Sequence, residues 1–171
     1  MGNLKLMSSS FEDGGEIPRE CGYKNGNEQP TLRIFEIPDE AKSLALIMDD
    51  PDAMGAVGKV WVHWVVWHII PYENDYASGT RHDEIENLCE ERLFSSSAGA
   101  DRFHEGITDF GESGYGGPAP PDKRHTYVFK LYALDCKELT CADGEATKAD
   151  VEKAMEGHIL EQTTLTGTYA P

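Results

Sequence analysis

The most informative part of this chain is the stretch Gly114-Tyr115-Gly116-Gly117-Pro118-Ala119-Pro120-Pro121, which is closely followed by His125-Thr126-Tyr127. Its glycines and prolines are incompatible with a helix, so we expect a stiff, tight loop. The loop delivers His125 to the start of an apolar strand that we predict over residues 126–135. Bare backbone beside an imidazole is suited to holding a small anion, so this segment also predicts a binding site.

Two further segments predict buried strands. Residues 44–48 form a continuous apolar run that ends in the turn signal Asp49-Asp50-Pro51-Asp52. Residues 60–70 are rich in Val, Ile and Trp, and both faces are apolar, which is typical of a central strand covered on both sides. A helix is the competing interpretation of so long a run. Strict alternation places His63 on the same face as Val65 and Trp67.

The remaining pattern predicts a mainly β protein. Residues 31–37 and 163–169 are expected strands, and residues 4–7 are a weaker one. Thr147 and Asp150 have the spacing of a helix N-cap, and the helix is expected to run to about residue 160. A second helix is expected over residues 83–94. We therefore predict one domain over residues 1–171, a sandwich of two sheets with short helices at its edges.

Composition limits the classes of partner. The chain has 171 residues and a net charge of −16, so electrostatics disfavour nucleic acid and anionic bilayers. No apolar run approaches the ~20 residues of a membrane span, and the first residues lack the shape of a signal peptide, so we expect a cytoplasmic protein. The four cysteines lack C-x-x-C spacing, which predicts reduced thiols and argues against zinc. A bond between Cys136 and Cys141 in an oxidising compartment stays open.

The residues that bear chemistry gather around two histidines. His125 is expected at the rim of a sheet, and Asp50 and Asp52 are suited to orienting imidazoles there. His63 alone is more often a hydrogen-bonded core residue than a functional one. Three further histidines receive structural interpretations: His68 lies near a strand end, and two lie in polar surroundings expected at the surface, His82 and His104.

Metal and hydrolase chemistry have weaker support. Asp49, Asp50, Asp52, His63 and His125 are acceptable ligand types, but their spacing matches no metal motif, so we predict neither metal nor cofactor. The segment Gly111-Glu112-Ser113-Gly114-Tyr115 almost reads as the nucleophile elbow G-x-S-x-G. Tyr115 replaces its last glycine, and the following prolines forbid the helix that the elbow requires. We therefore do not predict an enzyme, although histidines and aspartates together leave general acid–base chemistry open.

Four ordered blocks resemble the phosphatidylethanolamine-binding protein family, most closely its small prokaryotic branch, often called Raf kinase inhibitor-like. The resemblance covers nearly the whole chain. The blocks are Asp50-Pro51-Asp52-Ala53, His63-Trp64-Val65-Val66, Gly114-Tyr115-Gly116-Gly117-Pro118-Ala119-Pro120-Pro121, and His125-Thr126-Tyr127 with Leu131-Tyr132-Ala133-Leu134-Asp135.

The resemblance implies an antiparallel Greek-key β sandwich with a few peripheral helices and a small anion pocket at one rim. Family members bind phosphate-bearing head groups there, and some inhibit proteases or kinases. By resemblance the ligand-binding residues are Asp50, Asp52, His63, Gly117, Pro120, His125 and Tyr127. The expected function is therefore non-catalytic binding of a small anion, with a protease- or kinase-inhibiting interaction module as the alternative. A homodimer is left open.

This chain departs from the family pattern at three positions. Met54 stands where the family usually has proline, His68 where it has asparagine, and Thr126 where it has arginine. The loop of residues 122–124 is also short and charged. These departures bear on the shape and specificity of the rim, and the expected helix over residues 83–94 is a candidate partner surface.

Overall fold

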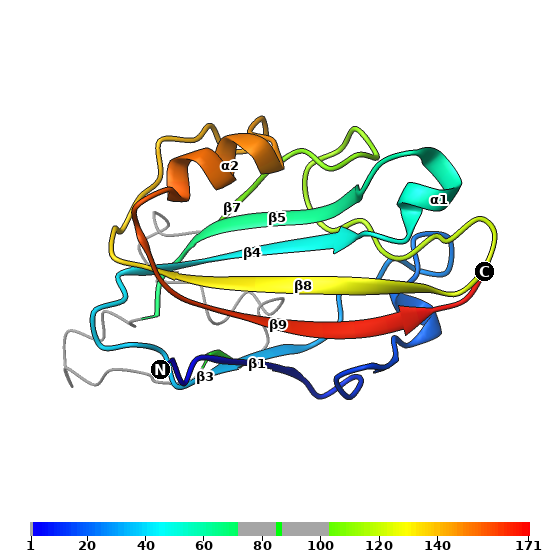
Figure 1. Ribbon diagram of the computed structural model, residues 1–171, viewed down its shortest axis with the longest axis horizontal. Helices are drawn as coiled ribbons and strands as arrows, with labels where there is room; N and C mark the ends of the chain where they lie inside the picture. Colours follow the sequence, from blue (N-terminus) through cyan, green and yellow to red (C-terminus); the bar gives the residue numbers. More distant parts are fainter. Residues whose placement is uncertain (1, 72–84, 87–102) are drawn as a thin grey trace.

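The computed structural model describes residues 2–71, 85–86 and 103–171, and strands dominate it (Figure 1). In chain order the elements are β1 (Lys5–Ser8), β2 (Gly15–Glu16), the 3-10 helix η1 (Arg19–Cys21), β3 (Leu32–Phe35), β4 (Ser43–Asp50), α1 (Ala53–Val57), β5 (Trp61–Ile69), β6 (Ile85–Glu86), β7 (His104–Glu105), β8 (His125–Leu134), α2 (Lys148–Met155) and β9 (Ile159–Tyr169). The mainly β prediction is confirmed, as are strands within or overlapping the predicted segments.

The strands form two sheets that pack face to face. The larger sheet has the order β2-β9-β8-β4-β5-β7, and the smaller has the order β1-β3-β6. Within the described part of the chain, the strand pairings are antiparallel except that between β2 and β9. One apolar core lies between the sheets, where Leu6 and Ile34 of the smaller meet Leu46, Trp64 and Phe129 of the larger. The Greek-key connectivity stays an expectation from the resemblance.

A second core covers the opposite face of the larger sheet. There α2 contributes Val151 and Met155, which pack with Ile47 of β4 and Val65 and Trp67 of β5. All eight residues of β4 are buried because cores lie on both of its sides. The prediction of a central strand buried on both faces is confirmed for β5.

The register of β5 against β4 shifts at His63. Consecutive residues of β4 pair with Trp64 and Val62, which leaves His63 as the extra residue of a bulge. The prediction that alternation would place His63 with Val65 is therefore wrong. Its ring instead contacts Tyr127, in the core between the sheets, with 5.1 Å between ring centroids. The bulge thus turns His63 toward the rim described below.

The predicted helix over residues 147–160 forms but is shorter. Thr147 and Asp150 make the capping box, and α2 ends at Met155. Gly157 then adopts a left-handed φ of 81°, which reverses the chain. Ile159, which falls within the predicted helix, begins β9 instead and is 44% exposed.

Three other expectations meet the structure in part. Of the predicted helix 83–94, the structure describes only Ile85–Glu86, which form a strand, so the helix is wrong there and the remainder lies outside the described residues. Cys21, Cys136 and Cys141 are free thiols, whereas His82 and Cys89 lie outside the described part. No helix in residues 2–71, 85–86 or 103–171 is long and apolar enough to cross a bilayer.

Candidate functional site

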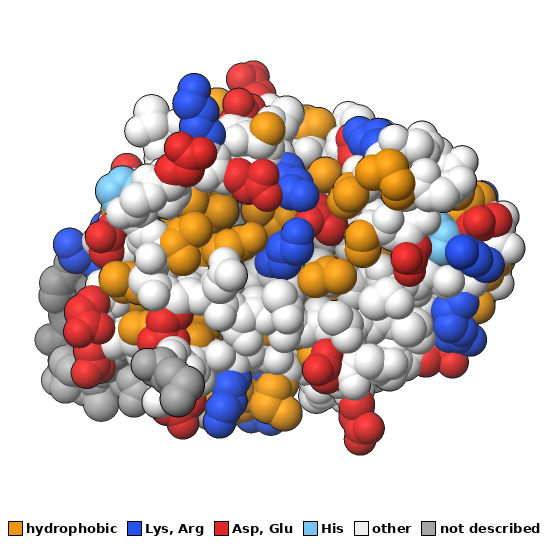
Figure 2. Space-filling model, in the orientation of Figure 1, with side chains coloured by type: hydrophobic (Ala, Val, Ile, Leu, Met, Phe, Trp, Pro, Cys, Tyr) orange, Lys and Arg blue, Asp and Glu red, His pale blue; other side chains and the backbone are white. Residues whose placement is uncertain are grey.

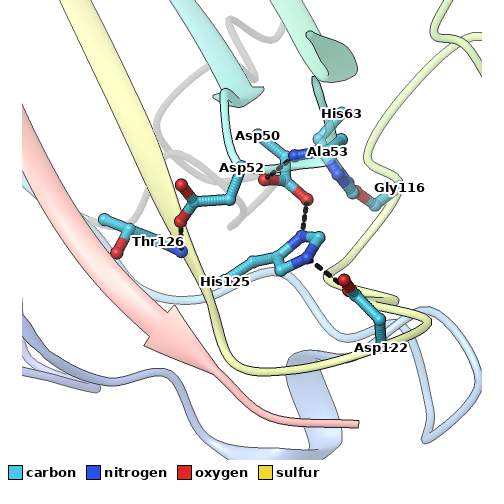
Figure 3. Close-up of polar contacts among 8 residues, drawn as sticks. All are labelled: Asp50, Asp52, Ala53, His63, Gly116, Asp122, His125 and Thr126. Atoms are coloured by element: carbon cyan, nitrogen blue, oxygen red, sulfur yellow. Dashed lines mark hydrogen bonds and ion pairs between the residues drawn. The ribbon is translucent and has the colours of Figure 1, made fainter. Parts of the chain in front are cut away.

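The candidate site lies at one rim of the larger sheet, where β4 ends and β8 begins (Figure 3). Asp50 is the last residue of β4, and His125 is the first residue of β8. Loop 114–121 and α1 approach the same rim, so the structure brings together most of the residues that the sequence singled out (Figure 1).

His125 is held between two carboxylates. Its Nδ1 lies 2.7 Å from Oδ2 of Asp50, and its Nε2 lies 2.8 Å from Oδ1 of Asp122. A carboxylate only accepts, so both bonds together require an imidazolium ring that donates from both nitrogens. Burial alone would lower the pKa of His125, but the hydrogen bonds to Asp50 and Asp122 outweigh it and raise that pKa above its ordinary value.

Asp122 is the member of this triad that sequence reasoning missed. Its side chain is 47% exposed, whereas those of His125 and Asp50 are buried. The hydrogen bond from His125 holds the pKa of Asp122 below its ordinary value. The spacing Asp122-x-x-His125 was visible in the sequence, but only the tight turn between them shows that the two side chains meet. Asp122 therefore accepts the hydrogen bond from Nε2, which we call the outer nitrogen of the His125 ring because its partner is the exposed carboxylate.

Asp50 and Asp52 organise the backbone around the histidine. Oδ1 of Asp50 accepts the N–H of Ala53 at 3.1 Å, where α1 begins, and Oδ2 of Asp52 accepts the N–H of Thr126 at 2.8 Å. Helix α1 was not predicted, because five residues are too few to show helical periodicity. The two aspartates therefore hold the backbone at the rim, and Thr126 takes part through its N–H group.

His63 forms a reciprocal pair with the loop. Its Nδ1 donates to the carbonyl oxygen of Gly116 at 2.7 Å, and the N–H of Gly116 donates to the carbonyl of His63 at 2.9 Å. Because a carbonyl only accepts, Nδ1 carries the proton and Nε2 of the neutral ring keeps a lone pair. Burial lowers the pKa of His63, against the opposing effects of the Gly116 bond and the charge of Asp50. The two site histidines are thus shifted in opposite directions.

The glycines of the loop serve close packing rather than anion capture. We expected their N–H groups to face a ligand, but that of Gly116 is bonded to His63 and that of Gly117 donates to Oδ1 of Asn27 at 2.7 Å. A Cβ on Gly117 would overlap the carbonyl of Cys21, and one on Gly116 would lie 2.5 Å from the Phe110 ring. The expectation of free N–H groups is therefore wrong for these two residues.

A cavity of about 190 Å³ opens beside this network. Two polar side chains line it, those of Asp50 and His63. The rest of the lining is apolar or aromatic: Ala53, Ala56, Val57, Trp61, Phe110, Ala119 and Pro121. Trp61 and Phe110 meet edge to face, with 5.6 Å between ring centroids. Sequence reasoning missed both rings as pocket residues.

The other five predicted ligand-binding residues do not line this cavity: Asp52, Gly117, Pro120, His125 and Tyr127. Of these, Gly117, Pro120 and Tyr127 are buried. Burial raises the pKa of the Tyr127 phenol, and the charge of Asp50 adds to the shift. The phenol oxygen lies beside Asp50 but makes no hydrogen bond of good geometry among the described residues. These residues shape the site from within.

Two other histidines lie away from the rim and have structural environments. His68 is buried with a left-handed φ of 59°, and its Nδ1 lies 3.0 Å from the carbonyl oxygen of Lys137. Its ring stacks on that of His104, with 5.1 Å between centroids. The structural interpretation of His68 agrees with these contacts, whereas His104, expected at the surface, is half-buried in β7.

Comparison with known proteins identifies the family. The sequence pattern of the phosphatidylethanolamine-binding protein family matches residues 7–170. The chain belongs to this family. Curated relatives include the UPF0098 protein of Methanothermobacter thermautotrophicus, which is 40% identical over 97% of this chain and 98% of its own length. The UPF0098 protein of Chlamydia muridarum is 35% identical over the same shares.

Solved structures agree with the assignment. The putative phosphatidylethanolamine-binding protein homologue CT736 of Chlamydia trachomatis superposes with a TM-score of 0.78 and 31% identity, covering 99% of this chain and 98% of that one. Escherichia coli YbcL superposes with a TM-score of 0.76 over 98% of both chains, and at 24% identity it supports the fold alone. Membership of the family suggests a binding protein.

Proposed function

We propose that this phosphatidylethanolamine-binding family member is a non-catalytic binding protein for a small phosphorylated or carboxylated ligand at the His125 rim. The observation that supports this is the outer nitrogen of His125, which already donates to a carboxylate, Asp122. A cationic, doubly donating imidazolium is well suited to a phosphate or carboxylate oxygen. The ligand anion takes the place that Asp122 fills in its absence.

The exchange is favourable only if Asp122 can move away while the rest of the site stays in place. Asp122 is half-exposed on a charged turn, whereas Asp50 is buried and anchored to Ala53 as well as to His125. The ligand therefore displaces the outer carboxylate and leaves the inner one. The cavity beside Asp50 and His63 then accepts the remainder of the ligand, against the Trp61 and Phe110 rings.

Titration calorimetry with phosphate and phosphorylethanolamine at pH 6 tests the proposal. Asp122→Asn removes the competing charge, so we expect both probes to bind more tightly than to the wild type. Glu156→Gln makes the same change of net charge on an exposed residue at the end of α2 and is the matched control. His125→Gln should abolish binding in a protein shown to be folded by circular dichroism.

If Asp122→Asn binds the two probes no more tightly than Glu156→Gln does, the ligand does not displace Asp122. If His125→Gln still binds them, the binding site is not at His125. The pH dependence adds an independent check. Because the pKa of His125 is raised, its ring stays cationic at pH values above the ordinary histidine pKa. The affinity for phosphate and phosphorylethanolamine should therefore be constant at acid pH and fall as pH rises through the raised pKa.

A protein-interaction role is the second candidate, and one observation favours it. Met54 and Val57 in α1 are 53% and 51% exposed, next to the cavity that Val57 helps to line. Figure 2 shows hydrophobic side chains gathered over α1, at the upper right. Such side chains fit a partner that covers the rim, including a protease or kinase surface. Met54→Lys distinguishes the two roles: it should bind phosphorylethanolamine as the wild type does but lose binding to the protein partner.

A further inference from the structure

At the end of β8 opposite His125, three side chains with different metal-ligating atoms converge. Asp135 and Cys136 follow β8 directly, and His158 immediately precedes β9. One oxygen, one sulfur and one nitrogen from these residues all lie within 4.8 Å of one another. The chain between α2 and β9 that carries His158 is at the left end of Figure 1. The cluster could not be predicted from the sequence, because Cys136 and His158 are 22 positions apart.

The backbone holds the three residues in place. The N–H of Asp135 donates to the carbonyl of His158 at 3.0 Å, which ties the two segments together. The carbonyl of Cys136 accepts the hydroxyl of Ser43 at 2.6 Å, and Ser43 is buried at the start of β4. The ligand atoms therefore project from a fixed base on the larger sheet, so little backbone ordering is needed on binding.

We propose that Asp135, Cys136 and His158 bind a thiophilic divalent cation of the zinc class. In a tetrahedral site with bond lengths near 2.0–2.3 Å, neighbouring ligand atoms are about 3.3–3.8 Å apart. Small side-chain rotations bring atoms now within 4.8 Å to that spacing. Thiolate and imidazole favour zinc over magnesium or calcium, which prefer all-oxygen sites.

The proton balance of binding is defined. In the free protein Nδ1 of His158 lies 2.7 Å from Oδ1 of Asp135, and Cys136 is a free thiol that is not part of a disulfide. The cation takes the place of the thiol proton, which passes to solvent, and the imidazole and carboxylate turn from each other to the metal. A surface ion pair explains two of the three residues but not the thiol beside them.

The surroundings leave room for a further ligand. A cavity of about 620 Å³ adjoins the cluster, lined by His158 together with Glu138, Cys141 and Asp150. Three protein ligands with an open position are the arrangement of zinc sites that also hold water or a small molecule. The side chains of His158 and Asp135 are 46% and 47% exposed, so a cation reaches them from solvent. The net charge of −16 also attracts cations.

Cobalt(II) is the probe, because a thiolate bound to it gives an intense charge-transfer absorption in the near ultraviolet. We expect this band to saturate at one Co²⁺ per chain in the reduced protein and to disappear on addition of Zn²⁺ but not Mg²⁺. Cys136→Ser should remove the band. Cys141→Ser is the matched control, because Cys141 lines the cavity beside the cluster but is not one of the three clustered residues.

His158→Gln tests the nitrogen ligand at an exposed position where misfolding is of little concern, and we expect at least tenfold weaker binding. The proposal is overturned if the wild type shows no band, if Cys136→Ser keeps it, or if Cys141→Ser removes it. If Cys136→Ser fails to fold, His158→Gln decides: unchanged affinity there overturns the site. Because these residues lie at the far end of β8 from His125, failure here leaves the anion proposal untouched.

Discussion

Two histidine–aspartate pairs lie at opposite ends of β8, and their geometry is nearly the same. Nδ1 of His125 lies 2.7 Å from Asp50, and Nδ1 of His158 lies 2.7 Å from Asp135. Their surroundings differ completely. Both side chains of the first pair are 4% exposed or less, whereas both side chains of the second pair are 46–47% exposed.

The difference shows that burial, more than distance, decides what such a pair can do. Two buried charges interact strongly, and removing one leaves the other without compensation. The His125 pair is therefore built into the fold, and a ligand can compete only for its outer partner, Asp122. Exposed pairs contribute little to stability, so the His158 pair can give up its hydrogen bond to a cation at small cost.

The largest expected effect comes from breaking the buried pair. Asp50→Asn keeps an oxygen for the N–H of Ala53 but leaves His125 without its inner counter-charge. We expect a loss of about 3 kcal/mol in the free energy of unfolding, at the low end for a broken buried pair because Asp122 remains. Urea denaturation at pH 6, where His125 is cationic, measures it.

Asp135→Asn is the matched control at the other end of β8. It removes the same charge from a pair of the same length, and we expect it to cost less than about 1 kcal/mol. Equal losses in the two variants would show that burial does not separate the pairs as we argue.

An intermediate effect is expected from the loop that packs behind the buried pair. In Gly117→Ala the new Cβ would overlap the carbonyl of Cys21 and lie 2.9 Å from the backbone nitrogen of Tyr23. Neither backbone atom can turn aside as a side chain would, so we expect a loss of about 1–3 kcal/mol, as for overpacking in a core.

Gly55→Ala is the control for this substitution. A Cβ there meets nothing within 4 Å, and alanine favours the helix, so α1 should be unchanged or slightly more stable. Cobalt binding at the His158 end should be the same in both glycine variants. A Gly117→Ala protein as stable as Gly55→Ala would mean that the loop is looser than its contacts indicate.

Much of this fold could be predicted from the sequence. The apolar pattern after the loop predicted β8, in which the alternating residues His125, Tyr127 and Phe129 are buried. The apolar runs predicted β4 and β5, and the capping spacing predicted the start of α2. These features are local, since each depends on residues adjacent in the chain or one helical turn apart.

What the sequence could not show depends on register and on contacts between distant segments. The bulge at His63 changes the face of the preceding strand residues without any glycine or proline to mark it. The bond from Gly117 to Asn27 joins residues 90 positions apart, and it turned an expected anion-binding N–H into a packing contact. The contact of Asp122 with His125 and that of Cys136 with His158 likewise depend on the folded chain and could not be predicted from the sequence.

The smallest expected effect is a pair of opposing slopes in stability with pH. His125 has a raised pKa in the fold, so its contribution is complete below the unfolded value of about 6.5 and is lost as pH rises through the folded value. His63 has a lowered pKa, so its contribution is present above about 6.5 and is lost as pH falls toward the folded value. Urea midpoints measured across this range should therefore peak near the ordinary histidine pKa. In His125→Gln the urea midpoint should no longer fall on the alkaline side of this peak, and the acid side should be unchanged. In His158→Gln, which removes the exposed histidine, the alkaline decrease should remain. If the decrease disappeared in His158→Gln instead, the exposed pair and not the buried one would be coupled to stability.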